Sequence, residues 1–218
     1  MDSEAKKEFV KTILCWWEKN RRDLPWRHTK EPYLTLITEI LLRKTTATHV
    51  NSIYQKFFEK YPTIQKLAGC EKKELKNIIT PLGLAEQRSE QLIKLAKTVI
   101  ADYNGKIPEK RSDLLKLPGV GNYTAAAVSC ISYGQDTSTV DTNFVRVIGR
   151  FFNFKSEKKS VYMDKKLWDF VTGMIPKGKC KEFNLGLIDF ASAVCIPKNP
   201  RCSECNMKEC CIYFNKQV

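Results

Sequence analysis

Four cysteines near the end of the sequence have a spacing suited to binding a cation. Cys195, Cys202, Cys205 and Cys211 form the pattern C-x6-C-x2-C-x5-C. Four thiolates in a short loop require a metal ion or a cluster to neutralise them, and zinc is one candidate. Zinc modules usually offer two close pairs of ligands, whereas only Cys202 and Cys205 form such a pair here. Cys210 is an extra thiol, and the spacing favours Cys211 as the fourth ligand. The other four cysteines have no partner pattern and are predicted to be buried apolar residues: Cys15, Cys70, Cys130 and Cys180.

A second chemical signal is the glycine-containing string Leu117-Pro-Gly-Val-Gly-Asn-Tyr-Thr-Ala125. A short helix precedes it, with Ser112 as the expected N-cap. Gly119 and Gly121 permit backbone angles and close approaches that a β-carbon would obstruct. An Ala-rich helix is predicted to begin near Asn122, and its free N–H groups and dipole suit a phosphate oxygen. An ordinary turn between two helices would explain a lone G-x-G.

Two carboxylates stand out by their surroundings. Asp141 directly precedes the segment running through Val145 and Ile148, and we expect it to be the N-cap of that helix. Glu39 is one polar residue in the mostly apolar segment 37–42. A glutamate in so apolar a setting is either paired or functional. Taken alone, the segment would also fit a glutamate on a solvent-exposed helix face.

The elements that must position these residues are helical. Apolar residues recur at three- and four-residue spacing in the segments 9–17, 34–42 and 92–100, whereas strand-like alternation is absent. Proline and glycine breaks fall at helix-length intervals. The sequence therefore predicts an all-α protein of about ten helices. The aromatic-rich segments 9–17 and 165–191 are candidates for packing together, which would make one domain from both ends of the chain.

The composition favours a polyanionic partner. The 218 residues include 37 Lys and Arg against 24 Asp and Glu, which gives a net charge of +13. A lysine-rich surface without a partner and an acidic membrane surface are the alternatives, but no stretch approaches the ~20 apolar residues of a membrane span. The first residues do not resemble a signal peptide, so we expect a cytoplasmic protein, or a nuclear one in a eukaryote. In a reducing compartment, a cysteine cluster indicates metal binding rather than disulfides.

The motifs together resemble a known superfamily. The string L-P-G-V-G-x-Y-T-A and the following Val140-Asp-Thr-Asn143 resemble the helix-hairpin-helix and V-D-x-[HN] motifs of the superfamily that includes endonuclease III and MutY-type adenine glycosylases. Leu24-Pro-Trp26, Pro32-Tyr33 and the [ST]-E-x-x-L around Glu39 resemble the MutY type. The cysteine spacing resembles the [4Fe–4S] loop of these enzymes. With Tyr123 and the string E-I-L-L-R-K-T-T, the chain looks most like the thymine–DNA mismatch glycosylases of the superfamily.

This resemblance implies two helical domains. A six-helix barrel that carries the helix-hairpin-helix is expected over residues 22–134. Residues 1–21 and 135–218 are expected to form an iron–sulfur cluster domain, and the active site is expected in the cleft between the two. The implied partner is double-stranded DNA with a mismatched base, bound by a monomer.

The resemblance also assigns the chemistry. The aspartate at the place of Asp141 is catalytic, because a carboxylate stabilises the oxocarbenium character of the sugar or orients the attacking water. Glu39 takes the place of a catalytic acid in the base pocket. Tyr123 stands where endonuclease III has the lysine that forms a Schiff base. A phenol cannot form that imine, so a monofunctional glycosylase is predicted, acting on T or U opposite G.

Further positions are implied as DNA contacts. Leu84 lies where the family places an apolar residue that enters the base stack. The MutY type has a glutamine pair at positions 43 and 44, so Lys44 would be the other wedge, and reading of the opposite base stays open. A core leucine, a surface lysine and solvated loop charges are the alternatives. The remaining expected contacts are Arg43, Pro118, Gly119, Val120, Gly121, Asn143, Lys198 and Arg201.

Two other functions stay open. One is a MutY-like adenine glycosylase that acts on A opposite G or oxidised G. The other is a non-catalytic iron–sulfur protein that binds DNA.

Overall fold

The computed structural model describes residues 3–216, and these residues contain α-helices and short 3-10 helices but no strand. The predicted all-α class is therefore confirmed. The described part of the chain has twelve α-helices, where the sequence indicated about ten. The shortest, α7 (Arg111–Leu114) and α12 (Ile212–Asn215), have four residues each, too few for apolar periodicity to reveal them.

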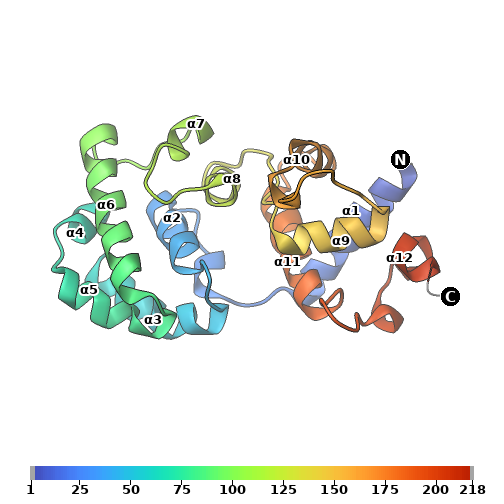
Figure 1. Cartoon of the computed structure of the whole chain (residues 1–218), viewed down its shortest axis with the longest axis horizontal. Helices are drawn as coiled ribbons and strands as arrows, with labels where there is room; N and C mark the ends of the chain where they lie inside the picture. Colours follow the sequence, from blue (N-terminus) through green and yellow to red (C-terminus); the bar gives the residue numbers. More distant parts are fainter. Residues whose placement is uncertain (1–2, 217–218) are drawn as a thin grey trace. The chain divides into compact units, whose positions relative to one another are not determined.

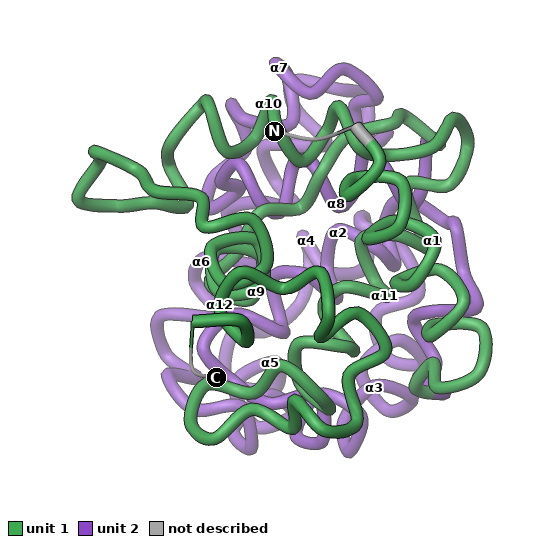
Figure 2. Tube along the Cα trace, turned by 90° about the vertical axis from the view of Figure 1, so that its right-hand side faces the viewer, with its two compact units in different colours: residues 1–22, 134–218 green, residues 23–133 purple. Residues whose placement is uncertain are grey.

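The described residues divide into two compact units (Figures 1 and 2). Unit 2 comprises residues 23–133, and unit 1 comprises the residues up to 22 together with those from 134 onward. The helices of unit 2 are η1 (Pro25–Arg27), α2 (Pro32–Leu41), α3 (Ala47–Lys60), α4 (Ile64–Ala68), α5 (Lys72–Ile79), η2 (Thr80–Leu82), α6 (Ala85–Tyr103), α7 and α8 (Asn122–Ile131).

The core of unit 2 is built on its longest helix, α6. This helix packs against α4 and α5, while α2 packs against α8. Leu92, Leu95 and Val99 lie on one face of α6 and are fully buried, as their three- and four-residue spacing requires. This packing holds α6 in place, and with it the turn at the N-terminal end of the helix.

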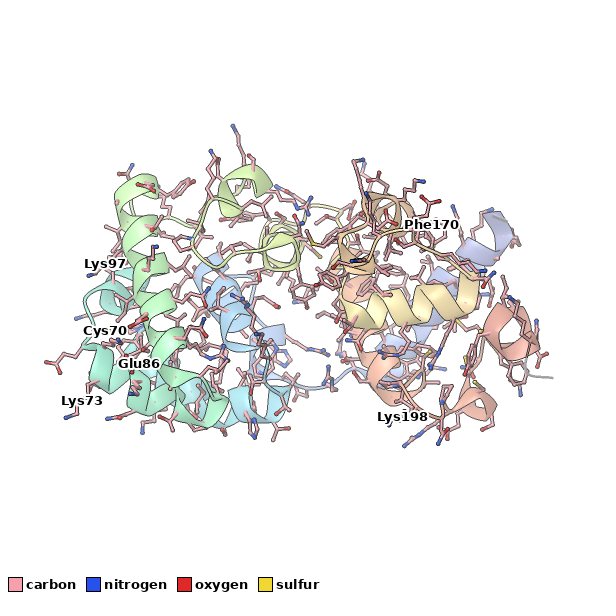
Figure 3. All side chains as sticks on the ribbon, in the orientation of Figure 1. Cys70, Lys73, Glu86, Lys97, Phe170 and Lys198 are labelled. Atoms are coloured by element: carbon pink, nitrogen blue, oxygen red, sulfur yellow. The ribbon has the colours of Figure 1, made fainter. Side chains whose placement is uncertain are left out.

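Ion pairs fix the first turn of α6 to α5. The Lys72 ammonium pairs with Glu86 and, at 2.5 Å, with Glu90. The Lys76 ammonium lies 2.7 Å from a carboxylate oxygen of Glu86, which Figure 3 shows on α6. All four side chains are well exposed, so each pair contributes little stability alone, but together they limit movement of the α6 N-terminus.

Unit 1 is formed by both ends of the chain. Its helices are α1 (Ser3–Asn20), α9 (Thr142–Phe152), η3 (Val161–Met163), α10 (Lys165–Thr172), α11 (Cys180–Ala193), η4 (Cys202–Glu204), η5 (Lys208–Cys210) and α12.

The first helix of the chain packs closely along α11. Gly186 makes this approach possible, because a β-carbon there would lie 3.0 Å from Cβ of Trp17 and 3.2 Å from Cγ2 of Ile13. The Phe9 ring, fully buried, stacks at 4.9 Å on Phe151 of α9. Three helices distant in sequence thus share one aromatic core, which holds α9 in place.

The predicted burial of the four remaining cysteines is only partly correct. Cys15 is exposed, so its predicted burial was wrong: it lies on the face of α1 away from Phe9 and Ile13. Cys130 and Cys180 are buried as predicted, and Cys70 is partly buried.

No helix among the described residues has both the length and the apolar character needed to cross a membrane.

Candidate active site and metal centre

Asp141 caps the N-terminus of α9, as the sequence predicted. Its Oδ1 accepts hydrogen bonds from the backbone N–H groups of Asn143 at 2.8 Å and Phe144 at 3.0 Å. Its Oδ2 accepts a third from the side-chain amide of Asn143 at 2.7 Å. Three donors and the positive end of the helix dipole therefore converge on one carboxylate.

The environment of this carboxylate acts on its charge in two opposite directions. Burial raises the pKa of Asp141 above its ordinary value, because it removes the charged form from water. The donors from Phe144 and Asn143 and the positive charge of Arg146 lower the pKa of Asp141 and partly offset the burial. The result is a poorly hydrated carboxylate that depends on a few fixed donors to stay ionised.

The extended segment before Asp141 is braced by α11. The side-chain oxygen of Asn184 accepts a hydrogen bond from the Thr139 N–H at 3.0 Å, and its amide donates to the Thr137 carbonyl at 2.8 Å. One helical turn further on, the buried Asp189 pairs at 2.6 Å with Arg22, which follows α1. These buried bonds fix the backbone that delivers Asp141 to the start of α9.

Arg146 links the capping group to the loop after α11. Its guanidinium donates to Oδ1 of Asn143 at 2.9 Å, to the Ala191 carbonyl at 2.9 Å and to the Cys195 carbonyl at 2.8 Å. Arg146 therefore orients the amide that bonds to Asp141.

The four cysteines of the predicted metal site line one cavity in unit 1. Cys195, Cys202, Cys205 and Cys211 border it, and their other neighbours are mainly apolar side chains of α9, α11 and the loop. Cys210 is exposed and does not line this cavity. Among residues 3–216, no three His, Cys, Asp or Glu side chains are arranged to hold a single metal ion.

Arg150 lies against this cavity and donates to the cysteine loop. Its guanidinium is 3.4 Å from Sγ of Cys195 and donates to the Ile196 carbonyl at 2.8 Å, and the Tyr213 ring stacks on it at 4.8 Å. Burial and the neighbouring sulfurs raise the pKa of the Cys205 thiol. Deprotonated sulfurs at this site would require compensating positive charge, and the Arg150 guanidinium supplies part of it.

The two basic loop residues expected to contact DNA are exposed. Lys198 lies on the loop that follows α11 (Figure 3). Arg201 is 3.9 Å from the carboxylate of Glu204, three residues further on. Because both side chains are exposed, both are accessible to a ligand.

The predicted hairpin joins α7 to α8 in unit 2. Gly119 has a φ of +77°, which favours glycine, and a β-carbon there would also displace the end of the flexible Gln91 side chain. Gly121 precedes α8 with an ordinary extended backbone, and a β-carbon on it would meet no atom within 4 Å. The neighbouring protein atoms therefore leave room for a side chain at this position, and a ligand that approached the backbone here would use that space. The predicted N-cap at Ser112 was wrong, because α7 begins one residue earlier, after Lys110, without a side-chain cap.

The other two predicted catalytic residues lie on the pair of helices that pack together in unit 2. Glu39 on α2 is only 8% exposed, which rules out the solvent-exposed position left open by the sequence. Tyr123 is the second residue of α8 and is partly buried. Because α2 packs against α8, both residues are carried by one rigid pair of helices.

The two predicted wedge residues line one pocket. Leu84 is 58% exposed, and Lys44 is also exposed. Each has a left-handed backbone with a φ of +52°, which costs a residue with a β-carbon on the order of 1 kcal/mol. Arg43 lines the same pocket and donates to the Gly119 carbonyl at 2.9 Å, which ties the Lys44 turn to the hairpin.

Sequence reasoning missed Arg88, which lines this pocket and is only 6% exposed. A signal was present, since Arg88 stands four and seven residues before Leu92 and Leu95, on the apolar face of α6. A charged residue on that face indicates a buried polar contact that the helix pattern alone does not explain.

Known proteins are similar to this chain in sequence and in fold. Residues 37–172 match the family described as HhH-GPD superfamily base excision DNA repair protein. A thymine/uracil-DNA glycosylase of Methanothermobacter thermautotrophicus is 49% identical over 98% of this chain and 96% of its own. The solved structure of a thermostable thymine-DNA glycosylase superposes with a TM-score of 0.94 at 49% identity, over 98% of both chains. A trapped endonuclease III–DNA covalent intermediate superposes at 0.85 with 26% identity, over 100% of this chain and 99% of that one.

Replacing Asn143 by alanine should raise the pKa of Asp141 further, because the amide that stabilises its charge is lost while its burial remains. A carboxyl whose folded pKa is raised stabilises the fold fully below its ordinary pKa and loses that contribution as the pH rises through the raised value. Asn143→Ala should therefore lower the free energy of unfolding more at pH 7 than at pH 4. NMR titration of the Asp141 carboxyl carbon measures the shift, with the exposed neighbour Thr142→Ala as control. An unchanged Asp141 pKa in Asn143→Ala would refute this account of its charge.

Proposed function

Because the chain belongs to the HhH-GPD superfamily of base excision DNA repair proteins, we propose that it hydrolyses the N-glycosidic bond of thymine or uracil opposite guanine in double-stranded DNA. The product is an abasic site. The observation that carries the proposal is the partly buried Asp141 carboxylate held by three N–H donors, in a chain half identical to a thymine/uracil-DNA glycosylase.

Asp141 supplies the charge that this reaction needs. As the base departs, the sugar gains oxocarbenium character, and a carboxylate lowers the free energy of that positive charge most where water is excluded. Burial of Asp141 provides the low dielectric, and the fixed donors keep the group ionised. The same carboxylate can orient the water that attacks the sugar.

Glu39 and Tyr123 define the rest of the chemistry. The buried Glu39 acts as the acid that assists departure of the base. Tyr123 has a phenol where a bifunctional enzyme needs an amine, so no imine with the sugar forms and the strand stays intact. We therefore propose a monofunctional glycosylase.

The hairpin is the proposed phosphate site. The N-terminus of α8 has no side-chain cap, and the open space beside Gly121 lets a phosphate approach the first N–H groups of the helix. Such contacts fix the register of the protein on the duplex and carry no sequence information. The net charge of +13 favours the same partner, and Asn143, Lys198 and Arg201 are further candidates for contact with DNA.

Base extrusion is assigned to Leu84 and Lys44. An exposed leucine held in a strained backbone is unusual on a soluble surface, and an apolar side chain of this kind fills the gap that a flipped base leaves. Lys44 in the same pocket stands where the MutY type has a glutamine, so the opposite base would be read differently from the MutY type.

We also propose a [4Fe–4S] cluster bound by Cys195, Cys202, Cys205 and Cys211. Four cysteines line one apolar cavity, and the Arg150 guanidinium reaches a sulfur there, which suits a group with thiolate ligands. Each thiolate of such a cluster binds a different iron, so three side chains need not converge on one ion. When bound, the cluster cross-links the loop at four points, and hydrolysis requires no redox step.

Duplexes that carry G·T, G·U, G·A and oxidised G·A pairs, each incubated with and without alkali, test the substrate and the mechanism together. We expect strand breaks in the G·T and G·U duplexes only after alkali, because the enzyme leaves an abasic site. Release from the G·A duplexes alone would make the protein an adenine glycosylase. Breaks without alkali would contradict the role of Tyr123, and binding without release of any base would indicate a non-catalytic DNA-binding protein.

The neighbouring variants Cys211→Ser and Cys210→Ser test the metal centre. Purified wild type should contain iron at the stoichiometry of a [4Fe–4S] cluster. Cys211→Ser should lose most of this iron and its visible absorption, because a ligand that lines the cavity is removed, whereas Cys210→Ser should keep both. Metal analysis and absorption spectra measure this. Zinc in place of iron, or loss of iron through Cys210 alone, would overturn the proposed ligand set.

A further inference from the structure

Arg88 makes an unusual set of hydrogen bonds for a buried cation. Its Nη1 donates to the carbonyls of Ile40 at 2.9 Å and Leu41 at 3.4 Å. Its Nη2 donates to the Arg43 carbonyl at 2.9 Å, and its Nε to the Gly83 carbonyl at 3.4 Å. One planar guanidinium thus contacts four backbone oxygens, in two segments about forty residues apart.

Two of these oxygens belong to the peptide units that directly precede the wedge residues. The Arg43 carbonyl is part of the peptide that leads into Lys44, and the Gly83 carbonyl is part of the peptide that leads into Leu84. Lys44 and Leu84 are also the two residues with a φ of +52° in these turns. When the peptide that precedes a strained residue is held in place, the direction in which the side chain of that residue points is fixed as well.

The burial of Arg88 has no other evident purpose. No carboxylate of the described residues contacts it, and burial lowers the pKa of its guanidinium, as does the nearby Arg43. An apolar side chain on this face of α6 would serve packing at a lower desolvation cost. The planar guanidinium has donors on three nitrogens and can bond to two segments at once, which the single ammonium of a lysine cannot do.

We infer that Arg88 is a positioning residue that sets the Lys44 and Leu84 turns together, so that both wedges enter the DNA as one rigid unit. The role of the two wedges rests on the proposed function, whereas the coupling of the two turns does not. The hydrogen bond from Arg43 to the Gly119 carbonyl connects the two wedge turns to the hairpin. The proposed phosphate contacts and the two wedge residues therefore lie on one rigid unit.

Hydrogen exchange of the DNA-free protein tests the coupling. The Thr45 amide donates to the Leu42 carbonyl and the Gly83 amide to the Thr80 carbonyl, so each amide reports on one turn. In Arg88→Lys both amides should exchange at least tenfold faster. Leu95→Ala, which opens a cavity two helical turns further along α6, should lower the melting temperature without this paired local effect. Unchanged exchange at either amide in Arg88→Lys overturns the inference.

Single-turnover excision from a G·T duplex then tests the positioning role. Leu84→Asn removes the wedge but tolerates the left-handed backbone, and we expect it and Arg88→Lys each to slow excision at least tenfold. The double variant should be no slower than the slower single variant, because Arg88→Lys already removes the positioning on which the contribution of Leu84 depends. Additive losses, or normal excision by Leu84→Asn beside slow excision by Arg88→Lys, would contradict the inference. A wild type that releases no base refutes the proposed function, and the exchange experiment still decides the coupling.

Discussion

The rest of unit 1 depends on keeping one partly buried carboxylate ionised. Asp141 is partly removed from water, and its charge is supported by two backbone N–H groups and the amide of Asn143. Those donors have the right geometry only if α9 begins at Thr142 and the segment before it is fixed, which Asn184 ensures from α11. The aromatic core between α1, α9 and α11 can thus be understood as the support of a single group.

Arginines that are buried or partly buried and donate to backbone carbonyls recur in both units. Arg146 holds the carbonyls of Ala191 and Cys195, and Arg150 holds those of Ile196 and Pro197. Arg88 does the same for the wedge turns. Because a guanidinium offers several donors in a rigid plane, one side chain can hold a loop whose own backbone forms no regular structure. Part of the positive charge of the chain therefore acts inside the protein, and the remainder is available to DNA.

The features that the sequence predicted correctly depend on local patterns. The helical class, the start of α8 at Asn122 and the cap at Asp141 follow from periodicity and from residue preferences over a few positions. The predicted cap at Ser112 failed because the short helix before the hairpin is held by its surroundings and not by a cap. Arg88 was missed because three of its four carbonyl partners lie more than forty residues away, and no local pattern reports such contacts.

The most direct test of this account is the substitution Asp141→Asn. An asparagine has nearly the same shape, and its Oδ1 can still accept the two backbone N–H bonds that cap α9, but it loses the bond from the Asn143 amide and carries no negative charge. The account predicts that the variant stays folded at the assay temperature and binds a G·T duplex, while single-turnover release of thymine falls by on the order of 10²–10³-fold. Release of thymine at the wild-type rate by a folded, DNA-bound Asp141→Asn protein would contradict it.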